Sequence, residues 1–234
     1  MGSVESAGTS AGMPIRVVVF DLDGVLVDSE PWWDAARVDF TARRGLRWGP
    51  DDQRAVMGPN SLGWARIMAE RLGLDEPLEA IVDEVVGGVV GRYRSLPAPV
   101  IAPAVRAVRR MGADRPLAVA SSSHRAVIGA ALEAIGLGSA FAVVVSSDEV
   151  AHGKPAPDVY LETARRLGED PAGCLVIEDS LNGVRAGRAA GMRVVLVPSA
   201  LVPPADGARE AASLVLDSLD QLDAAAIAQL EAAG

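Results

Sequence analysis

The sequence predicts an α/β fold in which a parallel sheet lies between two layers of helices, with a small helical domain inserted after the first strand. Three observations support this prediction. Short, continuously apolar segments rich in β-branched residues recur along the chain, as in strands buried on both faces. From residue 103 onward, helical patterns alternate with these segments, which is the arrangement that produces parallel pairing. The stretch between the first strand and Leu96 contains helical patterns and no convincing strand.

The first predicted strand, residues 17–20, ends at two carboxylates, Asp21 and Asp23, which Gly24 follows. Ligands of open α/β sheets bind beyond the carboxyl ends of the strands, so we expect this pair at the mouth of a site. Two carboxylates so close together repel each other unless a cation or a shared proton offsets their charge. A hard divalent cation that also binds phosphate oxygens meets that need. Solvated loop acids are the alternative interpretation of this motif taken alone.

Residues 30–96 are predicted to form the inserted helical domain. Pro31 suits the first turn of a helix, with Asp28 or Ser29 near the capping position. Within this domain, helices are expected at residues 32–44, 62–72 and 76–94.

Residues 14–29 and 97–234 are predicted to form the α/β core. Its later strands are expected at residues 117–120, 142–145, 174–177, 193–197 and 214–216. Its helices are expected at residues 103–111, 124–135, 157–167, 181–190 and 218–232. Residues 1–13 have the composition of a disordered leader. Hinges between the core and the inserted domain are expected at residues 27–29 and 96–99.

Composition excludes several classes of partner. The chain has 234 residues, of which 50% are hydrophobic and 23% charged, as in a packed globular protein. Its formal net charge of −9 disfavours nucleic-acid and anionic-membrane partners. Cys174 is the only cysteine, so no intrachain disulfide forms, which fits a reducing compartment. No apolar run has the length of a membrane span, and we expect a cytoplasmic protein that is a monomer or a weak dimer.

Polar side chains follow three later strands at the points where those strands end. The groups are Ser121, Ser122 and Ser123; Lys154 within Gly-Lys-Pro-Ala-Pro; and Glu178, Asp179 and Ser180. The topology places them at the same edge of the sheet as Asp21 and Asp23. A hydroxyl, an ammonium and a second carboxylate pair facing the first pair predict a pocket for a metal and a phosphate.

Lys154 is unusual in this chain. Of the 22 basic residues it is the only lysine, and the other 21 are arginines. A compact ammonium suits a crowded phosphoryl site better than a broad guanidinium does. A surface lysine retained by chance is the alternative.

Four segments resemble the four motifs of the haloacid dehalogenase superfamily, in that family's order and across about residues 15–197. They are Asp-Leu-Asp-Gly-Val-Leu-Val-Asp-Ser-Glu, Ala-Ser-Ser-Ser, Gly-Lys-Pro-Ala-Pro-Asp and Val-Ile-Glu-Asp-Ser-Leu-Asn-Gly. The inserted helical block resembles the small cap of the β-phosphoglucomutase-like branch. Within that branch, Asp-Ser-Glu-Pro-Trp-Trp and the tail Leu-Val-Leu-Asp-Ser-Leu look most similar to sugar-phosphate phosphatases such as 2-deoxyglucose-6-phosphate phosphatase. The resemblance implies a Rossmann-like core carrying a cap domain.

The resemblance also implies roles for four residues. Asp21 matches the nucleophile that attacks phosphorus and forms an aspartyl-phosphate. Asp23 matches the general acid that protonates the leaving alkoxide and then deprotonates water. Ser121 matches the hydroxyl that binds a phosphoryl oxygen, and Lys154 matches the cation that stabilises the transferring group.

The implied cofactor is Mg²⁺. The resemblance places it on Asp21, on the backbone carbonyl of Asp23 and on Asp179, with Glu178 beside it. The metal would offset the repulsion between carboxylate and phosphate and orient the phosphoryl group for in-line attack.

Four residues are candidates for binding substrate: Ser122, Ser123, Trp33 and His124. His124 at a helix start serves equally well as a surface residue. All four tryptophans of the chain, Trp32, Trp33, Trp48 and Trp64, lie in the cap. Stacking on a sugar face is one interpretation, but packing in the core of a small helical domain is favoured, since large aromatic residues dominate small cores.

These features predict a Mg²⁺-dependent phosphatase that hydrolyses phosphomonoesters of small metabolites, most of all sugar phosphates. Asp23 argues against dehalogenases, which lack this aspartate, and the cap contains no lysine for phosphonatase chemistry. A β-phosphoglucomutase-like phosphotransferase is the first alternative, although Trp33 and about Ser61 occupy the places of that enzyme's cap His and Arg. A phosphoacceptor signalling domain is less favoured, because the early Asp-x-Asp and the helical insertion do not fit it. A phosphate-binding protein without catalysis conflicts with the intact set of strand-end residues.

Overall fold

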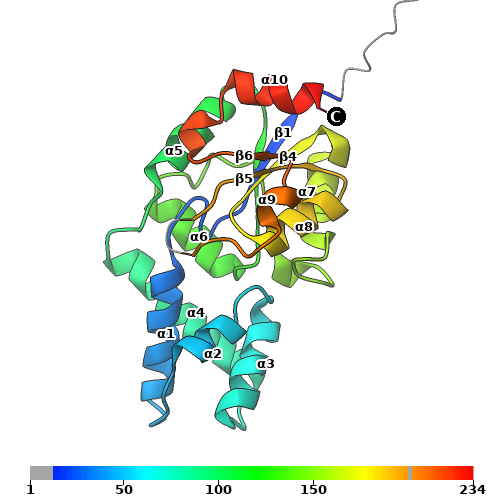
Figure 1. The fold of residues 1–234 in the computed structure, drawn as a ribbon. Coiled ribbons are helices and arrows are strands. Elements are labelled where there is room, and N and C mark those ends of the chain that lie inside the picture. The colour runs from blue at the N-terminus through cyan, green and yellow to red at the C-terminus, as the bar shows by residue number, and fades with distance from the viewer. Residues whose placement is uncertain (1–12, 200–201, 234) are drawn as a thin grey trace, which may run out of the picture.

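A six-stranded parallel sheet forms the centre of the molecule (Figure 1). The computed structural model describes residues 13–199 and 202–233, so the predicted leader lies outside the described residues apart from Met13. The strands are β1 (Val17–Phe20), β2 (Leu117–Ser121), β3 (Val143–Ser146), β4 (Cys174–Glu178), β5 (Arg193–Leu196) and β6 (Leu214–Val215). Their order across the sheet is β3-β2-β1-β4-β5-β6. The first strand therefore lies between β2 and β4, which brings the ends of these three strands together.

Helices cover both faces of the sheet, as the sequence predicts (Figure 1). One face packs against α5 (Ala102–Met111), α6 (Arg125–Ala134) and α10 (Ala224–Ala232). The other packs against α7 (Asp158–Leu167), α8 (Leu181–Ala189) and α9 (Ala208–Ala211). Successive residues of β1 serve the two layers in turn: Val18 and Phe20 join the first hydrophobic cluster, and Val17 and Val19 join the second.

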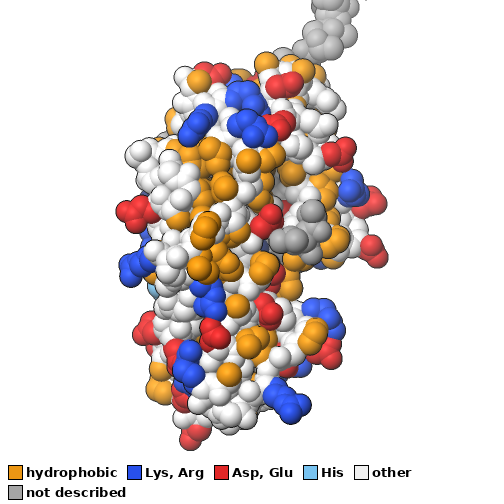
Figure 2. Space-filling model, turned by 90° about the vertical axis from the view of Figure 1, so that its left-hand side faces the viewer, with side chains coloured by type: hydrophobic (Ala, Val, Ile, Leu, Met, Phe, Trp, Pro, Cys, Tyr) orange, Lys and Arg blue, Asp and Glu red, His pale blue; other side chains and the backbone are white. Residues whose placement is uncertain are grey.

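The residues between β1 and α5 form a helical cap at the carboxyl end of the sheet (Figure 1). Its helices are α1 (Glu30–Ala42), α2 (Pro50–Ala55), α3 (Ser61–Leu72) and α4 (Leu78–Ser95). In the side view the cap is a separate lower lobe, with a hollow between it and the core (Figure 2). The two connecting segments run side by side, since Asp28 N donates to Pro99 O at 2.8 Å and Ile101 N donates to Leu26 O at 3.0 Å. Among the described helices, none is both long and apolar enough to span a membrane.

One local prediction, the extent of the last helix, was wrong. The last helix, expected at 218–232, is a 3-10 turn at Leu219–Gln221 followed by α10, because the Asp223 carboxylate caps α10 by accepting from Ala225 N at 2.9 Å and Ala226 N at 3.0 Å. Ser29 stands at the N-cap position of α1 but makes no side-chain cap. Its hydroxyl instead donates to the Asp23 carboxylate.

Candidate active site

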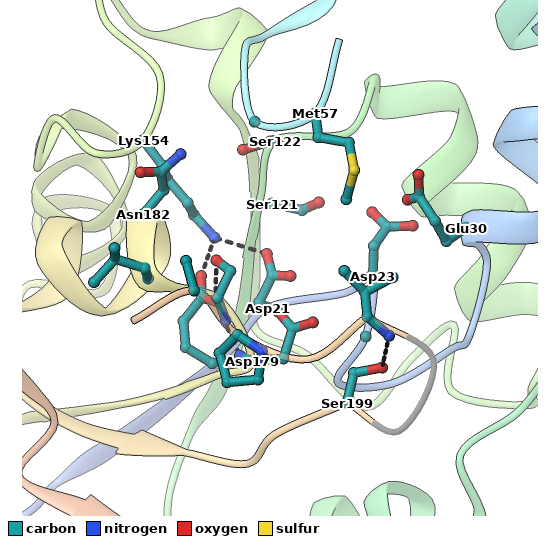
Figure 3. A pocket seen from close by; sticks show the side chains of 18 of the residues that line it. Asp21, Asp23, Glu30, Met57, Ser121, Ser122, Lys154, Asp179, Asn182 and Ser199 are labelled. Carbon is teal, nitrogen blue, oxygen red and sulfur yellow. Dashed lines mark hydrogen bonds and ion pairs between the residues drawn. The ribbon is translucent and has the colours of Figure 1, made fainter. Parts of the chain in front are cut away.

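A cavity of about 360 Å³ lies between the cap and the ends of β1, β2 and β4 (Figure 3). Seven of the predicted site residues line it: Asp21, Asp23, Ser121, Ser122, Lys154, Glu178 and Asp179. They come from four separate segments of the chain. They meet because the carboxyl ends of parallel strands lie at one edge of the sheet, which is the reason that the sequence analysis expected them to lie together.

Lys154 lies at the centre of this group and is 7% exposed. Its Nζ donates to Asp21 Oδ1 at 2.7 Å, to Glu178 Oε1 at 2.6 Å and to the carbonyl of Ala120 at 3.1 Å. Burial by itself lowers the pKa of the ammonium, but the charges of Asp21 and Glu178 outweigh it and raise the pKa well above its usual value. The lysine therefore remains charged, and it is held against the predicted nucleophile.

Glu178 has both carboxylate oxygens engaged. Oε1 accepts from Lys154 and from the Tyr160 hydroxyl at 2.7 Å. Oε2 accepts from Asp179 N at 3.1 Å, from Ser180 N at 3.2 Å and from Ser180 Oγ at 3.1 Å. Burial favours the neutral acid, yet Lys154 and these hydrogen bonds together lower the pKa of Glu178. Glu178 thus orients the Lys154 ammonium.

Three carboxylates crowd one point of the cavity. Ligand oxygens of Asp21, Glu178 and Asp179 lie within 4.8 Å of one another. Burial, together with the charges of Glu178 and Asp23, raises the pKa of Asp21 to about 7 despite the opposing effect of Lys154. Burial and the charges of Glu178 and Asp21 likewise raise the pKa of Asp179 well above its usual value. This excess of buried negative charge, carried by hard oxygen donors, fits a divalent cation.

Two glycines permit the crowding. A Cβ on Gly24, whose φ is 81°, would lie 1.9 Å from Asp179 Oδ2. A Cβ on Gly183 would lie 1.8 Å from Glu178 Oε1. Each glycine lets backbone approach a carboxylate that any larger residue would displace.

Asp23 faces away from these carboxylates. Its Oδ2 accepts from Ser123 Oγ at 2.6 Å, and its Oδ1 accepts from Ser29 Oγ and, at 3.4 Å, from Trp33 Nε1. Within the described residues the Asp23 side chain does not join the carboxylate cluster. The resemblance implied that only the backbone carbonyl of Asp23 binds the metal, and the observed orientation keeps its carboxylate apart from the cluster.

The predicted substrate-binding residues are distributed unevenly. Ser122 lines the main cavity, and Ser123 lines a smaller adjoining cavity of about 130 Å³. Trp33 also edges the smaller cavity but is only 5% exposed, and it packs against Trp64 with ring centroids 6.1 Å apart. Trp33 and Trp64 therefore belong to the cap core, which is the interpretation the sequence favoured. His124 lines neither of the cavities found among the described residues, and its Nδ1 accepts from Ala126 N at 3.2 Å to cap α6.

Sequence reasoning gave no role to several residues at the site, among them Tyr160, Glu30 and Met57. Tyr160 reaches Glu178 from α7. The only feature that distinguishes it in the sequence is the rarity of tyrosine, of which the chain has two. Glu30 and Met57 line the cap side of the cavity. Glu30 is the last residue of the first motif, so its position there, at the start of the cap, was the one available signal.

The fold and the site define the class of protein: an α/β protein with a parallel sheet, in which an aspartate at the end of the central strand is paired with a lysine. A family model for haloacid dehalogenase-like hydrolases matches residues 15–191. The chain therefore belongs to the haloacid dehalogenase-like hydrolases. Phosphatases of this family generally use a divalent metal, and the carboxylate cluster fits one.

Two similar proteins of known name are phosphatases. The bifunctional riboflavin kinase/FMN phosphatase of Arabidopsis thaliana is 36% identical over 191 residues, which are 78% of this chain and 48% of that protein. The chain thus spans about half the length of that relative. Hexitol phosphatase B of Escherichia coli K12 is 33% identical over 195 residues, which are 79% of this chain and 84% of that protein.

A solved structure shares the whole architecture. CbbY from Rhodobacter sphaeroides, crystallised in complex with phosphate, superposes with a TM-score of 0.78 at 25% identity. The match covers 89% of this chain and 96% of that one. The similarity extends across both the sheet and the cap.

Proposed function

We propose that this protein is a Mg²⁺-dependent phosphomonoesterase that acts on small phosphorylated metabolites, sugar phosphates above all. One observation carries the proposal: Lys154 is held 2.7 Å from Asp21 at the end of the central strand, beside the carboxylate of Asp179. The name of the hexitol phosphatase relative supports a sugar phosphate as the substrate class.

In the proposed reaction, Asp21 attacks phosphorus and forms an aspartyl-phosphate while the bond from phosphorus to the leaving oxygen breaks. Asp23 gives its proton to the departing alkoxide and then removes a proton from the water that cleaves the acyl phosphate. Lys154 and the Ser121 hydroxyl stabilise charge on the phosphoryl oxygens. The water's hydroxide bonds to phosphorus, inorganic phosphate leaves, and both aspartates return to their starting states.

The metal would be held by Asp21, Asp179 and the backbone carbonyl of Asp23, and when bound it offsets negative charge on the phosphoryl group. Glu178 lies beside these metal-binding residues and holds Lys154 against Asp21. The cap covers the cavity on the side away from the sheet, so it limits access of bulk water to the aspartyl-phosphate.

Phosphate release from purified protein tests the proposal. We expect steady multiple turnover with Mg²⁺ on a panel of sugar phosphates, and loss of turnover when a chelator removes the metal. A single phosphorylation per chain would instead indicate a phosphoacceptor domain. Conversion of one sugar phosphate into another without phosphate release would indicate a phosphotransferase.

A further inference from the structure

The cap contributes one carboxylate to the cavity. Glu30 is the first residue of α1, is partly buried and lines both the main cavity and the adjoining one. In the close view it lies across the pocket from Lys154 (Figure 3). It is therefore placed to meet the part of a substrate that extends from the phosphoryl group toward the cap.

A partly buried hydrogen-bond network fixes the orientation of Glu30. Gln53 Oε1 accepts from Trp48 Nε1 at 3.0 Å and from Arg37 Nη1 at 3.2 Å. Because the amide oxygen receives both donors, the amide nitrogen faces Glu30 and donates to its Oε1 at 2.5 Å. Within the described part of the chain, no donor reaches Glu30 Oε2.

Arg37 anchors this network from inside the cap. It is 5% exposed, and its guanidinium lies 5.2 Å from the ring centroid of Trp33 and 5.5 Å from that of Trp64. A guanidinium held in this way has little freedom to move toward a ligand. The cap thus presents an acceptor, the free oxygen of Glu30, to both cavities, whereas Arg37 lines only the smaller one.

The charged residues that line the main cavity also favour an uncharged substrate tail. Among its described lining residues, Lys154 is the only lysine or arginine, whereas the carboxylates are Asp21, Asp23, Asp28, Glu30, Glu178 and Asp179. Lys154 is already paired with Asp21 and Glu178. A second phosphate or carboxylate in the main cavity would therefore meet carboxylates with no cation of its own. Arg37 lines the adjoining cavity, where its Nη1 already donates to Gln53 Oε1 and where Glu30 and Asp23 also line the wall.

We infer that Glu30 is a specificity-determining residue that accepts a hydrogen bond from a hydroxyl of an uncharged polyol or sugar tail. Glu30 and the other carboxylates that line the cavity disfavour substrates that carry a second anionic group. This inference rests on the proposed function, and it assigns the substrate class from the cap side of the site.

The test compares substrates that share a phosphate but differ in the tail. We would measure kcat/KM for sorbitol 6-phosphate, which carries hydroxyls, and for p-nitrophenyl phosphate, which carries none. Glu30→Ala should lower the ratio of the first value to the second at least about ten-fold, as expected for loss of a hydrogen bond to a charged acceptor. Glu79→Ala is the matched control, because Glu79 is an exposed carboxylate in the first turn of another cap helix. It should leave the ratio unchanged.

A second comparison tests the rejection of anions. The wild-type protein should hydrolyse fructose 1,6-bisphosphate with a kcat/KM at least about ten-fold below that for fructose 6-phosphate. Glu30→Gln keeps an acceptor oxygen but removes the charge, so it should narrow this gap while retaining more activity on sorbitol 6-phosphate than Glu30→Ala does. A wild-type preference for the bisphosphate, or an equal loss on sorbitol 6-phosphate and p-nitrophenyl phosphate in Glu30→Ala, would overturn the inference.

Binding distinguishes this inference from the proposed function. Calorimetric titration of the Asp21→Asn protein with sorbitol 6-phosphate measures affinity without turnover. Adding Glu30→Ala should weaken that affinity at least about ten-fold, and an unchanged affinity would contradict the role of Glu30. If wild type releases no phosphate but the loss of affinity is found, the proposed function fails and the binding role of Glu30 stands.

Discussion

The core half and the cap half of the cavity are built in different ways. On the core side, Lys154 donates to Asp21, to Glu178 and to the carbonyl of Ala120 near the end of β2. On the cap side, Glu30 depends on Gln53, a residue of another helix, for its orientation. The first half fixes where a phosphoryl group can react. The second half determines what can be attached to it.

The cap and the core are also linked by a direct contact. Ser61 at the start of α3 donates to Asp148 of the core through its N at 2.8 Å and its Oγ at 2.6 Å. Ser61 also starts the helix that carries Trp64 of the cap core. Closure of the cap and the placement of its side chains are therefore coupled.

The largest effect should come from Asp21→Asn. Amide nitrogen and oxygen cannot replace the carboxylate nucleophile, so steady phosphate release should fall at least about a thousand-fold. Because burial raises the pKa of Asp21 to about 7, the neutral substitute should not lower the Tm in the absence of metal. Phosphate release and thermal unfolding of the same preparation measure both effects. Retained turnover would remove Asp21 from the reaction.

Lys154→Ala should affect both activity and stability. It removes the positive charge at the phosphoryl site and leaves Asp21 and Glu178 buried without their cation. We expect kcat to fall at least about a hundred-fold and the free energy of unfolding to fall by about 3–5 kcal/mol.

The matched variant is Lys154→Arg, which keeps the charge but is too broad for the site. It should lose activity with a smaller loss of Tm than Lys154→Ala. Equal stability of Lys154→Ala and wild type would show that the ion pairs do not support the core half.

Metal-free protein should become less stable as pH rises. The pKa of Asp21 is raised from 3.8 to about 7 on folding, so the folded state binds the extra proton between these values. The associated stability is present below pH 4 and is lost as pH passes 7. Mg²⁺ competes with that proton, so it should bind more tightly at pH 8 than at pH 6.

Thermal unfolding with and without Mg²⁺ measures this dependence. The Tm gained from Mg²⁺ should be larger at pH 8 by at least about 3 °C, the shift that roughly 1 kcal/mol produces in a protein of this size. Unfolding at a more acid pH, where many other carboxylates titrate, is not a useful comparison. A gain independent of pH would contradict the titration of the carboxylate cluster.

The smallest effect should come from breaking the link between the halves. Ser61→Ala and Asp148→Asn should each raise KM by about two- to ten-fold, as expected for losing one hydrogen bond. If the two residues act as a pair, the double variant should show less than the product of the single effects. Independent, multiplicative effects would mean that the contact does not hold the cap closed.

Sequence patterns located the core half of the site well. Asp21 and Lys154 are 133 positions apart, yet both follow parallel strands, and such strands place their carboxyl ends at one edge. The predicted strands and most helices agree with the structure within a few residues for the same reason: each element carries its own hydrophobic period. The last helix was misjudged because Asp223 caps a shorter one.

The side-chain contacts that orient the site residues, in the core and in the cap, could not be predicted in this way. These contacts join residues that share no local sequence pattern. Examples are the hydrogen bond from Ser29 to Asp23, which helps to orient the Asp23 carboxylate, and the hydrogen bond from Tyr160 to Glu178. The same holds for the Arg37–Gln53–Glu30 network.

The sequence by itself determined a parallel α/β core with a helical insertion, and the strand-end residues that form the chemical half of the site. Only the tertiary structure decided which oxygen of Glu30 remains free, which way Asp23 points, and that Glu178 orients Lys154. The physical reason is that backbone periodicity and strand ends are local properties of a chain. The direction of a buried polar side chain depends on whichever partners the completed packing brings within hydrogen-bond distance.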